Sequence, residues 1–67
     1  MSIYAIAGNV KKVRTEKFHE TQEKFAERLS VSTRTVQNLE MGYCLPKLPT
    51  LIKIALAAGL TLDALLA

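Results

Sequence analysis

The stretch TQEKFAERLSVSTRTVQNLEMG, residues 21–42, decides the fold, because it encodes two short helices with almost nothing between them. Thr21 suits the N-cap of the first helix, whose apolar residues all fall on one face. Ser32 suits the N-cap of the second helix, and Gly42 is a natural terminator for it. We therefore predict helices over residues 22–29 and 33–41, joined by a very short turn.

The second of these helices has two unlike faces. Val36 and Leu39 lie on one side and predict a narrow contact with the core. On the other side, within about 140° around the helix axis, the residues are Thr33, Arg34, Gln37 and Asn38. Each can contact a base edge, and none is acidic. This helix-turn-helix arrangement predicts a helix that enters the major groove of DNA. The simpler alternative is a solvated face without a partner.

The flanking segments also show helical patterns. The apolar stripe of the first segment is Ile3, Ile6, Val10 and Val13. It predicts a helix that Ser2 caps and that ends near Lys17. Residues 48–58 predict another helix, which Gly59 terminates, and Thr61 caps a last short helix, LDALLA. We expect an all-α fold, a compact five-helix bundle.

Length and composition restrict the class of protein. The 67 residues have room for one domain, 1–67. The single cysteine, Cys44, excludes an internal disulfide and fits a cytoplasmic location. One cysteine and one histidine cannot supply the four ligands of a structural zinc site, so we expect no metal. The net charge of +3 permits a polyanionic partner.

Other function classes find no support in the sequence. No apolar run approaches the roughly 20 residues that a membrane-spanning helix needs. No nucleophile lies beside a general base, so we expect no catalytic residue and no enzyme activity. A chain this short has no room for a ligand-sensing domain, so we expect no cofactor and no small-molecule ligand.

From about Val10 to Leu66 the sequence resembles the Cro/repressor-type helix-turn-helix regulators, the XRE family. The residues that carry the resemblance are TQEKFAERLSVSTRTVQNLEMG, the following PKLPTLIKIALAAG, and LTLDALL. The resemblance implies a lambda-repressor-like domain whose second and third helices form the helix-turn-helix. It also implies double-stranded DNA as the partner.

The resemblance also implies roles for individual residues. The positions that match base-reading residues are Ser32, Thr33, Arg34 and Asn38, with Gln37 beside them. The expected phosphate contacts are Gln22, the backbone amides of the loop at Gly42, Tyr43 and Cys44, and the cations Lys12 and Lys47. Arg14 and Glu40 match an ion pair that would brace the second helix of the motif.

The sequence departs from the family pattern at four places. Ser30 stands where the turn usually has glycine, so its backbone is expected to need a positive φ. Met41 replaces a residue that is commonly polar, and Lys47 replaces the usual Ser or Thr cap of the fourth helix. The connector between the first two helices is about one residue longer than usual.

The last informative group is apolar, at Leu60, Leu62, Leu65 and Leu66. A core this small is not expected to bury them all. They predict either a two-fold dimer contact through the last helix and the turn before it, or a frayed apolar end. Together the observations predict a transcriptional repressor that binds an inverted-repeat operator as a homodimer. The alternative is a protein-interaction module, such as an antitoxin-like partner of a neighbouring gene product.

Overall fold

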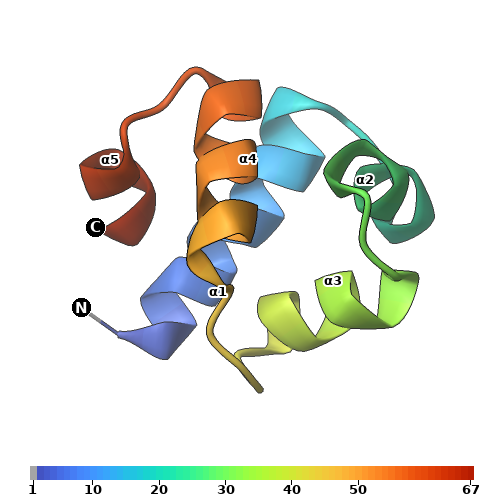
Figure 1. The fold of residues 1–67 in the computed structure, drawn as a ribbon, viewed down its shortest axis with the longest axis horizontal. Helices are drawn as coiled ribbons and strands as arrows, with labels where there is room; N and C mark the ends of the chain where they lie inside the picture. The colour runs from blue at the N-terminus through green and yellow to red at the C-terminus, as the bar shows by residue number, and fades with distance from the viewer. Residues whose placement is uncertain (1) are drawn as a thin grey trace.

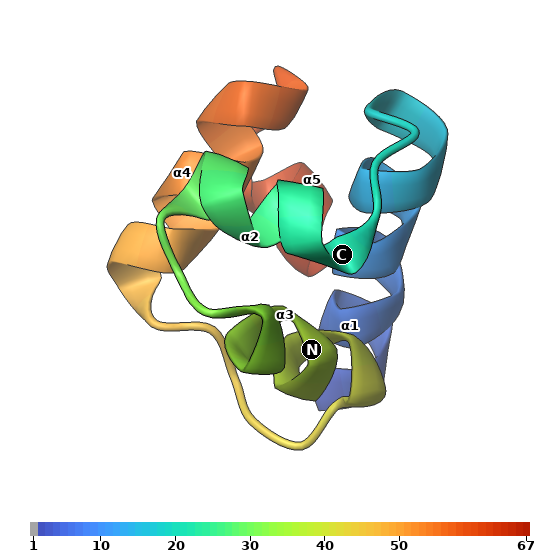
Figure 2. The ribbon, with the colours of Figure 1, turned by 90° about the vertical axis from the view of Figure 1, so that its right-hand side faces the viewer.

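A computed structural model describes residues 2–67 and confirms the all-α, five-helix architecture (Figure 1). The helices are α1 (Ile3–Lys12), α2 (Gln22–Leu29), α3 (Thr33–Met41), α4 (Leu48–Ala58) and α5 (Leu62–Leu66), and a π-helical turn, η1 (Val13–Lys17), continues α1. In Figure 1, α4 stands in the middle, with α5 on one side, α2 and α3 on the other, and α1 crossing behind. Figure 2 shows α3 and the loop that follows it at the same end of the molecule.

Every helix contributes to one apolar core. The side chains that are almost fully buried are Ile6 and Val10 of α1, Phe25 and Leu29 of α2, Val36 of α3, Ile54 of α4 and Leu65 of α5. Within residues 2–67 the core contains no buried polar or charged side chain. A core of this kind stabilises the fold through apolar burial and close packing.

The helix ends follow the predicted caps. The hydroxyls of Ser2, Thr21, Ser32 and Thr61 each accept a hydrogen bond from a backbone N–H in the first turn of the helix that follows. Gly42 and Gly59 end α3 and α4 in the left-handed conformation, with φ of 76° and 69°. These caps satisfy backbone groups that a helix leaves unpaired at its ends. They explain why the helix boundaries are readable in the sequence.

The connector between the first two helices begins with a π-helical turn. In η1 the Phe18 N–H donates to the Val13 carbonyl five residues earlier, at 3.1 Å, as in a π-helix. His19 then turns the chain with a left-handed φ of 53°. The Glu20 N–H returns to the Arg14 carbonyl at 3.1 Å. The π turn and the left-handed His19 therefore set the path of the chain into α2.

The leucines near the end of the chain do not form the exposed surface that the sequence suggested. Leu65 is fully buried in the core, and Leu62 and Leu66 are half-buried against it. The Asn9 amide also holds this helix against α1, because its Nδ2 donates to the Leu65 carbonyl at 2.7 Å. The expectation of a dimer contact is wrong for the Leu65 side chain. Of the four leucines, Leu60 alone is exposed.

Candidate nucleic-acid interface

The turn between α2 and α3 is held by backbone geometry and by one cap. Ser30 adopts a left-handed conformation, with φ of 57°, as its position in the turn predicted. The Val31 N–H closes the end of α2 on the Ala26 carbonyl at 3.0 Å. The Ser32 Oγ accepts from the Thr35 N–H at 3.1 Å and lies 2.9 Å from the Thr35 hydroxyl. The Ser32 hydroxyl is therefore engaged in starting α3.

Helix α3 presents the predicted polar face to solvent. Val36 and Leu39 are buried against the rest of the domain. Arg34 and Gln37 are exposed. Thr33 and Asn38, at the two edges of this face, are half-buried. Within residues 2–67, the polar side-chain groups of Arg34, Gln37 and Asn38 form no hydrogen bond with another side chain. Their donors and acceptors are left for an outside partner.

Met41 is an additional member of this face that the sequence did not indicate as a contact. At 100° per residue it falls between Gln37 and Arg34 around the axis of α3. Its side chain is 57% exposed, which is unusual for methionine. An exposed apolar side chain among base-reading candidates can pack on the methyl group of thymine. Its helical phase was the one signal that could have identified it.

An ion pair between η1 and α3 holds α3 in place. The Arg14 guanidinium donates to both carboxylate oxygens of Glu40, at 2.6 and 2.9 Å. Both side chains are largely buried, at 12% and 3% exposed, and the hydrogen bond to Glu40 raises the pKa of Arg14. Arg14 also donates to the Glu20 carbonyl at 2.9 Å. A bidentate pair fixes direction as well as distance, so α3 has little freedom to rotate.

The same carboxylate fixes a residue of α2. The Gln22 Nε2 donates to the Glu40 Oε1 at 3.2 Å. The sequence predicted Gln22 as a phosphate contact without this internal partner. Since Nε2 carries two hydrogens, one donor remains after the bond to Glu40 is made. Gln22, Arg14 and Glu40 therefore form one network that joins η1, α2 and α3.

A second ion pair orders the connector before α2. Arg28 donates to both oxygens of the Glu20 carboxylate, at 2.9 and 3.1 Å. This hydrogen bonding lowers the pKa of Glu20 and raises the pKa of Arg28. The Arg28 guanidinium also lies 4.0 Å from the centroid of the Phe18 ring, within the range of a cation–π contact. This arrangement holds the connector but lies apart from the polar face of α3.

The loop after α3 offers fewer backbone donors than expected. The Gly42 N–H donates to the Leu39 carbonyl at 3.3 Å, and the Tyr43 N–H to the Asn38 carbonyl at 3.0 Å. Both amides are bonded to carbonyls at the end of α3, which leaves them less free to approach phosphate, and that contact stays a prediction. Within the described chain the Cys44 N–H has no backbone partner. The Tyr43 side chain, 71% exposed, keeps its hydroxyl available.

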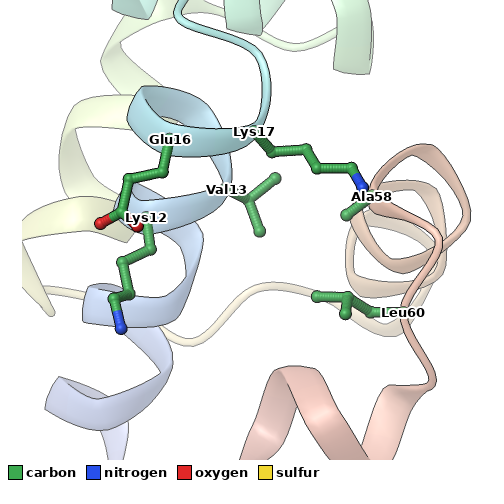
Figure 3. A pocket seen from close by; sticks show the side chains of 6 residues that line it. All are labelled: Lys12, Val13, Glu16, Lys17, Ala58 and Leu60. Atoms are coloured by element: carbon green, nitrogen blue, oxygen red, sulfur yellow. The ribbon is translucent and has the colours of Figure 1, made fainter.

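The two lysines expected at phosphates lie in different parts of the molecule. Lys47 is exposed at the end of the loop after α3, beside the inner residues Thr35 and Leu39 of that helix. Lys12 instead borders a shallow groove of about 260 Å³ next to Ala58 and Leu60 (Figure 3). It lies about 200° around the helix from Arg14, the residue that faces α3. Lys12 therefore lies apart from the candidate interface at α3 and its loop.

Helix α4 carries an exposed apolar stripe. Leu48, Ile52 and Leu56 recur every fourth residue and are 59%, 39% and 76% exposed. Leu60 is 41% exposed but follows the turn at Gly59 and lines the groove beside Lys12 and Val13. One cation, Lys53, lies beside the stripe, but its Nζ is bound to the Leu29 carbonyl at 3.1 Å. A contiguous apolar surface of this kind is a typical mark of an interface.

The comparison with known families agrees with this geometry. A family model described as Helix-turn-helix matches residues 10–65, from the end of α1 to α5. No curated protein and no solved structure matches the chain. Among the described helices, none is long and apolar enough to cross a membrane. The matched family consists of DNA-binding regulatory domains and is not a family of enzymes. The chain belongs to the XRE-type, Cro/C1-type family of helix-turn-helix DNA-binding regulators.

Proposed function

We propose that this chain is a sequence-specific transcriptional repressor that acts in the cytoplasm and binds an inverted-repeat operator as a homodimer. The observation that carries the proposal is the outward face of α3. Within residues 2–67 its Arg34, Gln37 and Asn38 side chains have no hydrogen-bond partner, no acid lies among them, and the pair Arg14–Glu40 orients the helix. Bases are read by side chains that are held in place and free to bond.

Individual side chains of α3 suit different bases. Arg34 has the fork geometry that binds O6 and N7 of guanine. Gln37 and Asn38 carry amides that can pair with N6 and N7 of adenine. Thr33 and Met41 offer apolar atoms to the methyl group of thymine. Ser32 is the weakest candidate, because its hydroxyl already caps α3.

The phosphate contacts would surround this face. They comprise the second Nε2 hydrogen of Gln22, the Cys44 N–H, the Tyr43 hydroxyl and the Lys47 ammonium. Such contacts orient a protein on the duplex without reading its sequence. Lys47 is the one cation among them, so it should dominate their dependence on salt.

The dimer would form through the stripe of α4 rather than through the last helix. Leu48, Ile52 and Leu56 expose apolar surface that a second copy can cover across a two-fold axis. Two recognition helices would then enter successive major grooves about 34 Å apart. A dimer seated on a promoter in this way would block polymerase directly.

A protein partner is the second candidate, because the same stripe could serve a different chain. The two readings predict different results when sequences are selected from a random duplex library with purified protein. Enrichment of an inverted repeat with half-sites one helical turn apart would support the dimeric regulator. Recovery of unrelated sequences, with weak and salt-sensitive binding, would refute it in favour of the protein-interaction module.

A further inference from the structure

A hollow of about 350 Å³ lies under the loop that joins α3 to α4. Val31, Leu39, Leu45 and Pro46 give it mainly apolar walls, and Thr50 of α4 forms part of its border. This volume lies near the lower end of the range for ligand pockets, about 300–1,000 Å³. It therefore suits a molecule smaller than a typical drug.

The charge of the lining restricts the ligand further. Lys47 is the one charged residue of the lining, and no carboxylate borders the hollow. Apolar walls beside one cation complement an apolar body that carries one negative charge. We propose that this hollow binds a small monocarboxylate, with its hydrocarbon body against Leu39 and Pro46 and its carboxylate at the Lys47 ammonium.

The sequence predicted no small-molecule ligand, because the chain has no room for a sensing domain. A hollow inside the DNA-binding domain needs no additional domain. It is bordered on one side by the inner residues of α3 and on the other by the loop that ends at Lys47. Occupancy would therefore act directly on the interface.

The regulatory consequence rests on the proposed function, whereas the binding itself does not. A ligand carboxylate and a DNA phosphate would compete for the Lys47 ammonium. By linkage, each would weaken the binding of the other by the same factor. The repressor would then release its operator when the carboxylate accumulates.

Cys44 allows the site to be tested without DNA. It lines the hollow, it is exposed, and it is the one thiol in the sequence. We would follow its alkylation by iodoacetamide with mass spectrometry, in the presence of 4-phenylbutyrate or octanoate. Both carboxylates should slow the reaction in a saturable way. The uncharged 4-phenylbutanamide should do so far less, because it cannot pair with Lys47.

Three variants separate the site from a general charge effect. Lys47→Gln should abolish the difference between the carboxylate and the amide. Lys12→Gln removes the same charge from the distant groove and should preserve that difference. Thr50→Phe should fill the hollow and remove protection, provided that its thermal melting shows a folded domain. If Thr50→Phe does not fold, the Lys47→Gln comparison decides the question.

Absence of saturable protection by both carboxylates would overturn the proposal. Equal protection by the amide, or in Lys47→Gln, would also overturn it. In the presence of DNA, a saturating carboxylate should raise the Kd for a selected duplex by about fivefold or more. If no duplex is selected, the proposed function fails. The alkylation of Cys44 still tests carboxylate binding, because that experiment uses no DNA.

Discussion

Replacing Lys47 by glutamine should change how DNA binding depends on salt. Lys47 is exposed at the end of the α3–α4 loop, whereas Lys12 borders a groove beside Ala58 and Leu60. Each dimer would carry two copies of Lys47 at the duplex. A cation that neutralises one phosphate adds about −0.9 to the slope of log K against log salt. The variant should therefore lose a slope of about 1.8.

This slope corresponds to a measurable difference in affinity. Between 50 and 200 mM salt, the original protein should lose about 12-fold more affinity than Lys47→Gln does. Fluorescence anisotropy with a selected duplex, repeated at several salt concentrations, measures both slopes. Lys12→Gln is the matched control, because it removes the same charge and should leave the slope unchanged. Equal slope changes in the two variants would refute the placement of the interface at α3 and its loop.

Three further predictions concern α3, the turn before it and the connector before α2. Arg34→Ala should weaken binding by about 1–3 kcal/mol and relax preference at one base pair, which selection with the variant would reveal; an unchanged preference would contradict the contact. Ser30→Gly should stabilise the fold by about 0.5–1 kcal/mol, because it removes left-handed strain but adds flexibility to the unfolded chain. Thermal melting would show a rise of about 2–8 °C, and a fall would contradict it. Glu20 has a pKa lowered by Arg28, so its stabilisation is present above the ordinary value of 4.5 and is lost as the pH falls through the lowered value. Glu20→Gln should lose less stability over that acidic range in urea unfolding, and a parallel loss would argue against the pair.

The sequence was sufficient where structure depends on neighbouring residues. A hydroxyl at an N-cap or a glycine at a helix end acts within one turn, so Thr21, Ser32 and Gly42 mark their helices without tertiary information. The apolar face of α3 was equally clear, because α3 can bury both Val36 and Leu39 in only one orientation.

The features that the sequence did not reveal depend on how helices meet. Helix α4 is apolar on two faces, and its sequence does not show that Leu56 remains exposed. Leu65 is buried because α5 packs back onto α1, where Asn9 binds its carbonyl. The Tyr43 amide donates to a carbonyl at the end of α3, and this hydrogen bond depends on the conformation of Gly42. Each of these outcomes is set by tertiary geometry rather than by local pattern.

The π turn also affects how this chain should be aligned with related sequences. An inserted residue is ordinarily assigned to a loop, which here would be the connector before α2. Residues 13–17 form a π turn here, inside the segment that the family model matches. Because a π turn closes over five residues rather than four, a gap placed within residues 13–17 is compatible with a continuous helix.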